Sequence, residues 1–290
     1  MSGSPGQYAA LSGSYDGLMW DGDYPARAAF FGDILRESSI PVETVLDLGC
    51  GTGTITWLLY RQGFRMIAAD NSEEMLTEAI RKGDAMREAI RKGDATREAI
   101  RKGDAAREAI CKGDATPTDA PDIPEPLFIC QSMPRLKLAA PVDGVISTFD
   151  SLNYLTRERD LRETFRRVAR YLTPGGRFLF DVNTPYRFRM MNRQTYLDET
   201  EESFCAWRTF FSEKRQVCVW QVDLFRRRPD GAWERSFEEH RERAWSMEQL
   251  REFLRDAGFS RVEITGDLSR KPPKESETRW FVLAEKVESI

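Results

Sequence analysis

The chain has 290 residues, of which 41% are hydrophobic and 31% are charged, and this balance is typical of a globular protein. Its 43 basic and 47 acidic side chains give a net charge of −4, which argues against an extended nucleic-acid-binding surface. The apolar runs are only strand-sized, so no transmembrane helix is expected.

The N-terminal sequence lacks a basic stretch followed by an apolar core, and the five cysteines form no C-x-x-C pair. A zinc site is not expected either, because the sequence contains a single histidine, His240. We therefore expect a cytoplasmic protein with reduced thiols, no bound metal and no membrane partner.

Residues 1–40 are rich in aromatic side chains set among small residues. We predict two helices here, the second from about Tyr24 to Arg36. Tyr15 and Trp20 belong to the aromatic leader that precedes the second helix.

A glycine-rich turn organises the segment that follows. Residues 44–48 form a short apolar strand, glycines occupy positions 49, 51 and 53, and a helical pattern runs from Ile55 to Gln62. Glycine allows a positive φ angle and lets a ligand approach bare backbone. A strand, a glycine turn and a helix N-terminus together form a nucleotide site at the carboxyl edge of an open parallel sheet.

Two acidic residues indicate which nucleotide would bind. Asp47 precedes the G-x-G-x-G turn, where an acid disfavours a pyrophosphate but suits the ammonium group of an amino acid. The second predicted strand, residues 65–69, ends at Asp70, where an acid can hold a ribose diol. A ligand that has both an amino-acid end and a ribose is S-adenosylmethionine (SAM).

The turn resembles the D-x-G-x-G-x-G motif of the class I SAM-dependent methyltransferases. The resemblance implies an α/β fold with a Rossmann-like, seven-stranded, mostly parallel sheet and helices on both faces. It implies SAM as cofactor and S-adenosylhomocysteine as product. An N-terminal helical lid over the cofactor, within residues 1–40, is also implied; the alternative is that these aromatics pack on the sheet. We expect the cofactor contacts to be Tyr15, Asp47, Gly49, Cys50, Gly51, Gly53, Asp70, Asn71, Met75, Ser132, Met133 and Phe149.

The helix after Asp70 begins with Ser72 as its N-cap, and Met75 packs either on an adenine ring or in the core. Residues 77–116 then contain four near-copies of a ten-residue unit, R-E-A-I-R-K-G-D-A-x. Ten residues advance by about 1000° on one helix, so the isoleucines of successive copies would not share a face. We predict short helices that break at each Gly-Asp pair. Such an array would bind a partner or a second copy; the alternative is a tolerated spacer.

Residues 117–184 return to the core that begins with residues 41–76. Strands are predicted at 127–130, 144–148 and 177–182. Ser132 stands where aspartate is common in the family, so its hydroxyl or the Met133 backbone would contact adenine. Past the second of these strands, four polar residues would face the crevice and contact the substrate or cofactor, namely Asp150, Ser151, Asn153 and Tyr154. The Leu-x-Pro-Gly-Gly-x-Phe-x-Phe-Asp pattern around the last strand again resembles the class I family.

Residues 185–245 are predicted to form an antiparallel insert, with strands near 203–211, 216–226 and 232–245 and a hairpin turn at residues 228–231. Such an insert walls off the acceptor pocket in many small-molecule methyltransferases, and the resemblance implies that role here. The phrases Asp-Ser-Leu-Asn-Tyr-Leu, Phe-Asp-Val-Asn-Thr-Pro and Glu-Glu-His resemble a bacterial group of this type whose acceptors are not established. Residues 246–290, a helix from Met247 to Ala257 and two strands, complete the core.

Methyl transfer to oxygen or nitrogen requires the acceptor to lose a proton, which a general base near pKa 7 assists. His240 is the candidate base, paired with Glu238 or Asp181, although a lone histidine on a strand is often simply packed. Tyr154 is a further catalytic candidate. The expected acceptor contacts are Trp20, Asn153, Asn183, Trp220 and Glu238.

We therefore interpret the chain as a SAM-dependent methyltransferase that acts on an oxygen or nitrogen of a small molecule. Two alternatives remain open. One is an RNA or protein methyltransferase whose repeats dock the partner. The other is a SAM-binding protein that assembles through its repeats without turnover.

Overall fold

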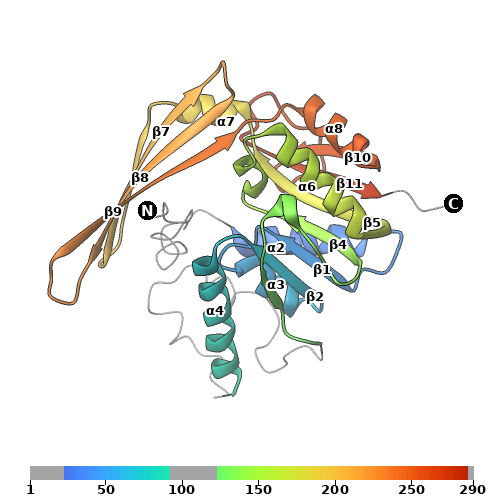
Figure 1. Cartoon of the computed structure of the whole chain (residues 1–290), viewed down its shortest axis with the longest axis horizontal. Coiled ribbons are helices and arrows are strands. Elements are labelled where there is room, and N and C mark those ends of the chain that lie inside the picture. Colours follow the sequence, from blue (N-terminus) through green and yellow to red (C-terminus); the bar gives the residue numbers. More distant parts are fainter. Residues whose placement is uncertain (1–22, 92–122, 287–290) are drawn as a thin grey trace.

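The computed structural model describes residues 23–91 and 123–286. These residues form a seven-stranded sheet with helices on both faces and a second, four-stranded sheet that projects from it (Figure 1). In order across the larger sheet the strands are β10 (Phe259–Gly266), β11 (Arg279–Lys286), β5 (Leu172–Asn183), β4 (Val142–Ser147), β1 (Thr44–Leu48), β2 (Arg65–Asp70) and β3 (Leu127–Cys130). The predicted fold class is confirmed, because only the contacts of β11 are antiparallel in this sheet.

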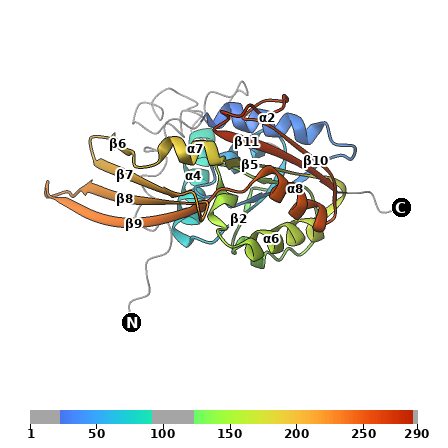
Figure 2. The same cartoon turned by 90° about the horizontal axis from the view of Figure 1, so that it is seen from above.

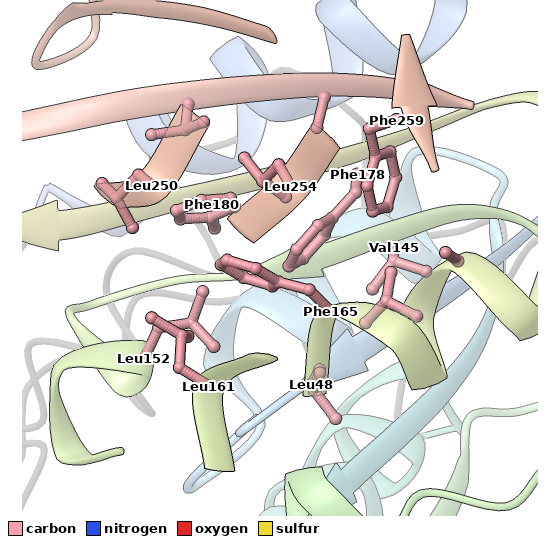
Figure 3. Packing of buried hydrophobic residues seen from close by; sticks show 14 of the residues in the cluster. Leu48, Val145, Leu152, Leu161, Phe165, Phe178, Phe180, Leu250, Leu254 and Phe259 are labelled. Atoms are coloured by element: carbon pink, nitrogen blue, oxygen red, sulfur yellow. The ribbon is translucent and has the colours of Figure 1, made fainter. Parts of the chain in front are cut away.

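The central strands β1, β4 and β5 are buried on both faces, which is why they read as continuous apolar runs. Helices α2 (Tyr24–Arg36) and α3 (Thr54–Arg61) cover one face, where Val45 of β1 packs. Helices α6 (Glu158–Tyr171) and α8 (Met247–Asp256) cover the other, where Leu46 packs. Figure 3 shows the centre of this second layer, where the rings of Phe165, Phe178 and Phe180 meet between α6 and β5.

The strand order reverses between β1 and β4, and this reversal positions the site. The connections from β1 and from β4 leave the sheet in opposite directions, so a crevice opens beyond their carboxyl ends. Two short 3-10 helices line the ends of β3 and β4, namely η3 (Met133–Arg135) and η4 (Ser151–Tyr154).

Helix α4 (Glu73–Arg91) corrects the prediction for the repeats. It continues through Gly83 and Asp84, where a break was expected, and so carries the whole first copy. The reason is tertiary: a β-carbon at residue 83 would lie 2.1 Å from Cζ2 of Trp57, so glycine lets the two helices approach. A glycine inside a helix costs only about 1 kcal/mol, which this packing offsets. The remaining junctions lie outside the described residues.

The smaller sheet contains β6 (Thr195–Glu199), β7 (Ser203–Ser212), β8 (Val217–Arg227) and β9 (Trp233–Arg243) in that order. The three predicted strands of the insert correspond to β7, β8 and β9, whereas β6 and helix α7 (Pro185–Met191) were not predicted. The hairpin turn at residues 228–231 is present and is closed by the bond from Arg228 N to Ala232 O. Seen from above, the sheet extends well beyond the seven-stranded core, with α7 beside its root (Figure 2). No helix within the described ranges is long and apolar enough to cross a membrane.

Candidate functional site

The turn after β1 uses three left-handed glycines for three different reasons. Gly49, with φ of +78°, has no room for a side chain, because a β-carbon would lie 2.5 Å from Cε of Met133 and 2.9 Å from Cβ of Ser151. A β-carbon on Gly53, with φ of +72°, would lie 2.8 Å from that of Ala79 in α4. Gly51, with φ of +53°, meets nothing within 4 Å. The backbone at Gly51 is therefore the open part of the turn.

Asp70, at the end of β2, is held beside this opening. Its Oδ2 accepts a hydrogen bond from the Gly51 N–H at 2.9 Å, and its Oδ1 accepts one from the Ser72 N–H at 2.9 Å. Burial raises the pKa of this carboxyl, and the hydrogen bonds from Ser72, Gly51 and Asn71 oppose that rise. Each carboxylate oxygen can accept more than one hydrogen bond, so both retain capacity for a donor in the crevice.

A single pocket joins the ends of β1, β2 and β4. Its lining combines bare backbone, hydroxyls, one carboxylate and apolar side chains, an arrangement suited to a nucleoside with a short polar tail. The lining residues are Tyr24, Gly49, Cys50, Gly51, Thr52, Thr54, Ile55, Asp70, Asn71, Met75, Met133, Thr148, Phe149, Ser151 and Tyr154.

Eight of the predicted cofactor contacts lie in this lining, and Asp47, Gly53 and Ser132 do not. Gly53 serves helix packing, as described above, and Ser132 lies before η3, whose Met133 reaches the pocket. Tyr15 lies outside the described residues, as does Trp20 among the predicted acceptor contacts.

Asp47, which was expected to contact the ammonium group, does not line the pocket. Its side chain is fully buried beneath the turn, and its Oδ2 accepts a hydrogen bond from Thr56 Oγ1 at 2.6 Å. Its other oxygen is buried without a hydrogen-bond partner among the described residues. Burial raises the pKa of Asp47 to about 7, with the Thr56 bond opposing and Asp70 adding to the rise. Asp47 therefore supports the turn from below rather than facing the pocket.

The first copy of the ten-residue unit supports the pocket from its outer side. Lys82 of α4 is 8% exposed, and its Nζ donates hydrogen bonds to the hydroxyls of Thr52 and Thr54 at 2.8 and 2.7 Å. Both threonines line the pocket. The repeat unit thus contributes to the site through its first copy, which the sequence pattern alone did not indicate.

Asp181, which was predicted as a catalytic residue, does not line the pocket but holds one of its walls. Its carboxylate accepts hydrogen bonds from the backbone N–H groups of Phe149, at 3.1 Å, and of Asp150, at 2.9 Å. Arg27 of α2 donates to it at 3.2 Å, and Arg279 of β11 donates as well. Burial alone would raise the pKa of Asp181, but the two guanidinium groups bring it below its usual value. A carboxylate so saturated is a poor general base.

These bonds explain an unusual backbone at the end of β4. Phe149 and Asp150 are consecutive non-glycine residues with φ of +53° and +54°. Such a conformation costs about 1–3 kcal/mol for each residue unless the surroundings fix it, and the Asp181 carboxylate supplies that restraint. The result places the Phe149 ring in the pocket wall, 4.6 Å from the ring of Tyr24, centroid to centroid.

The far end of the pocket meets the smaller sheet at Tyr154. The ring of Tyr154 lies 6.2 Å from that of His240 in an edge-on arrangement. His240 is 1% exposed, and its Nε2 lies 3.0 Å from Oε2 of Glu238, also on β9. The structure therefore brings three predicted residues together, with Tyr154 in the lining and the other two behind it.

Three residues that were predicted to contact the acceptor lie outside the pocket lining and bind other parts of the protein. Asn153 donates to the carbonyls of Asn183, at 3.1 Å, and Arg243, at 2.8 Å, and Asn183 Nδ2 donates to Glu242 at 3.0 Å. These buried bonds join η4, β5 and β9, so Asn153 and Asn183 fasten the smaller sheet to the core. Trp220 packs against Trp207 and the apolar side chains of its own sheet.

Sequence reasoning missed five lining residues. Thr52, Thr54 and Ile55 lie within or directly after the glycine turn, so their positions in the motif could have identified them. Thr148 ends a strand whose carboxyl end was already predicted to face the crevice, and Ser151, which was predicted as a contact there, also lies in the lining. Tyr24 comes from α2, and no local signal connects it with a turn that lies 25 or more residues away along the chain.

Comparison with known proteins shows which protein family this chain and its fold resemble. A family model described as a methyltransferase domain matches residues 23–264. The "Putative methyltransferase YqeM" of Bacillus subtilis (strain 168) is 27% identical over 286 residues, covering 98% of each chain. The solved structure of an S-adenosylmethionine-dependent methyltransferase from Clostridium acetobutylicum superposes with a TM-score of 0.76 at 24% identity, over 97% of this chain and 99% of that one. The sugar N-methyltransferase KedS8 of Streptoalloteichus superposes with a TM-score of 0.67 at 19% identity, over 99% of both chains.

Proposed function

Since the chain belongs to the methyltransferase domain family and is a SAM-dependent methyltransferase, we propose that it methylates an oxygen or nitrogen atom of a small-molecule acceptor. SAM, when bound, supplies a methyl carbon that its sulfonium already activates for displacement. The protein's residues therefore have to bind, align the two reactants and exclude water.

The pocket suits this cofactor on the observations above. The bare backbone at Gly51 accommodates a group that a side chain would displace, and both oxygens of Asp70 can accept bonds from a ribose diol. Met75 and Ile55 provide apolar surface for an adenine ring. We therefore assign Asp70 to the ribose and the Gly51 turn to the methionine portion, which would leave Phe149 and Tyr154 on the acceptor side of the pocket.

We place the acceptor at the Tyr154 end of the pocket, facing the smaller sheet. His240 and Glu238 form a titratable pair beside that end, and His240 is buried behind the Tyr154 ring. In this proposal the imidazole of His240 takes up the acceptor's proton and the Glu238 carboxylate stabilises the charge that results. Tyr154 aligns the acceptor and shields the reacting atoms from water.

The observation that carries the proposal is the enclosure of this pair. Both side chains lie behind the Tyr154 ring at the end of a recessed pocket, and such a pocket suits a small molecule better than a polymer. The fold shared with KedS8, which is described as a sugar N-methyltransferase, supports the same acceptor class.

The test is a turnover assay that measures S-adenosylhomocysteine release with a panel of amines, amino sugars and hydroxylated sugars, and in parallel with total RNA and unmodified protein. We expect turnover with at least one small molecule. An Asp70→Asn variant should weaken SAM binding by about 10- to 100-fold in calorimetry, since one charge-assisted bond contributes about 1.5–3 kcal/mol. Turnover confined to RNA or protein would refute the acceptor class.

A further inference from the structure

Lys82 places a buried positive charge at the edge of the pocket. It belongs to α4, within the first copy of the ten-residue unit, and only 8% of the residue is exposed. Its Nζ donates hydrogen bonds to the hydroxyls of Thr52 and Thr54, both of which line the pocket. The ammonium group therefore lies within one side chain of whatever binds there.

The bond from Lys82 decides what the Thr54 hydroxyl can offer to a ligand. A hydroxyl has one O–H donor and two acceptor positions, whereas an ammonium group has donors only. Because Lys82 Nζ, 2.7 Å away, occupies an acceptor position, the O–H of Thr54 remains available as a donor within the described part of the chain. A charged donor behind the hydroxyl also polarises it and strengthens its own O–H bond to a further acceptor. Thr54 is therefore suited to a negatively charged ligand group.

Thr54 is also the first residue of α3, and this helix reaches the pocket lining through Thr54 and Ile55. The first N–H groups of a helix have no partner within the helix, and they favour a negative group nearby. The residue before α3 is Gly53, and no side chain caps the helix. A carboxylate of the ligand can therefore take the position that a capping side chain occupies in other helices.

The charges around the pocket distinguish the start of α3 from the ribose end. Burial raises the pKa of the Cys50 thiol well above its usual value, nearby carboxylates add to this rise, and the charge of Lys82 opposes it. The field of Lys82 therefore reaches a residue of the pocket lining. At the ribose end, Asp70 already binds the N–H of Gly51, so this donor does not serve a second carboxylate. A carboxylate is thus repelled beside Asp70 and attracted towards Lys82.

We propose that Lys82 fixes the carboxylate of SAM's methionine portion at the start of α3, where the Thr54 hydroxyl donates a hydrogen bond to it. Lys82 acts through this hydroxyl and through its charge, so it is a positioning residue rather than a catalytic one. The first copy of the ten-residue unit is thereby part of cofactor recognition. The inference rests on the proposed assignment of the glycine turn to the methionine portion.

The test compares two ligands that differ in one group. S-adenosylhomocysteine carries the carboxylate, and its decarboxylated analogue carries hydrogen in that position. Calorimetry measures the Kd of both ligands for the full chain and for Lys82→Met, which keeps an unbranched side chain and removes the charge. We expect Lys82→Met to raise the Kd of S-adenosylhomocysteine by about tenfold or more, as for the loss of a charge-assisted bond, and that of the analogue by less than about twofold.

Arg81→Met is the matched control, because Arg81 is the preceding residue of α4 but is exposed and binds Glu78 at 2.8 Å. This variant should bind both ligands as the parent chain does. If Lys82→Met does not unfold cooperatively in urea, Thr54→Val replaces it, since valine keeps the shape of threonine and lacks the hydroxyl. Thr54→Val should show the same selective loss.

Equal weakening of the two ligands by Lys82→Met would mean that the lysine only supports the fold of the turn, and it would overturn the proposal. Unchanged affinity of that variant for S-adenosylhomocysteine would overturn it as well. A parent chain that binds both ligands equally well refutes recognition of the carboxylate alone. A parent chain that binds neither ligand refutes the cofactor site itself, so the two failures are distinguishable.

Discussion

Replacement of Asp181 by asparagine tests the claim that this residue holds the pocket wall rather than acting as a base. Asparagine has nearly the same shape, but it removes the negative charge and can accept through only one atom. The variant therefore loses at least one of the two backbone bonds at Phe149 and Asp150 and weakens the contacts of both arginines.

The expected loss of stability in Asp181→Asn follows from the groups that surround this carboxylate. Removing one partner of a buried ion pair costs about 3–5 kcal/mol. Here Arg27 keeps its bonds to Asp267, at 3.0 and 3.1 Å, and Arg279 keeps Asp150, at 2.8 Å. We therefore expect the lower limit, a fall of about 3 kcal/mol in the free energy of unfolding. Relaxation of Phe149 from its left-handed conformation should raise the Kd for SAM by about tenfold.

Urea denaturation and calorimetry with SAM measure the two quantities. Asp143→Asn is the matched control, because Asp143 also accepts two backbone N–H bonds, from Glu43 at 3.2 Å and Thr44 at 3.0 Å, but lies at the opposite end of the strands. It should cost about 1 kcal/mol and leave SAM affinity unchanged. The reasoning fails if Asp181→Asn is as stable as the control, or if it binds SAM as tightly as the parent chain.

The pH dependence of the same variant is a second check. The pKa of Asp181 is lowered in the folded chain, so its stabilising contribution is present above the unfolded-state pKa of about 3.9 and is lost as pH falls through the lower folded-state value. The difference in stability between the parent chain and Asp181→Asn should therefore be constant near neutral pH and shrink in acid. A difference that persists unchanged at pH 2 would contradict an ionised Asp181.

Three further outcomes are expected. Because burial raises the pKa of Asp47 to about 7, the folded chain keeps a proton that the unfolded chain releases near pH 4, and Asp47 therefore lowers the stability of the fold as pH rises between those values. In urea titrations, Asp47→Asn should be more stable than the parent chain by up to a few kcal/mol at pH 8 and by little at pH 4. An equal gain at both pH values would contradict the raised pKa. Gly83→Ala should lose about 1–3 kcal/mol through its clash with Trp57, whereas a thermal melt showing stabilisation would mean that helix propensity outweighs packing there. His240→Gln should lower kcat by about 10²- to 10⁴-fold with SAM affinity unchanged once an acceptor is known, and full activity would end its assignment as base.

Local patterns were sufficient for much of the fold because each depends on residues close together in the chain. The alternation of residues 217–224 identified β8, and Ser246 with Gln249 forms the capping box that begins α8. Strand β6 and helix α7 were not predicted, because both are short and β6 is exposed along most of its length. Neither therefore shows a clear apolar period in the sequence.

The repeats show where local reasoning fails. The Gly-Asp pair at residues 83 and 84 matches a helix end by every local rule, yet α4 continues through it. The deciding contact is Trp57, which belongs to a helix 26 positions earlier in the chain. A rule that considers only neighbouring residues cannot include that contact.

The amino-acid sequence by itself determined the glycine turn, the acid at the end of β2 and the class of ligand they bind, because a strand, a turn and a helix start are specified by adjacent residues. Only the tertiary structure decided which carboxylates face the pocket. Asp47, Asp70 and Asp181 all lie in core strands. Asp47 is buried beneath the turn and does not reach the pocket, and Asp181 binds Arg27 and Arg279, which lie 154 and 98 positions away along the chain. The desolvation and ion pairing of a carboxylate depend on the side chains that the fold brings near it, and the spacing of residues along the sequence does not reveal those neighbours.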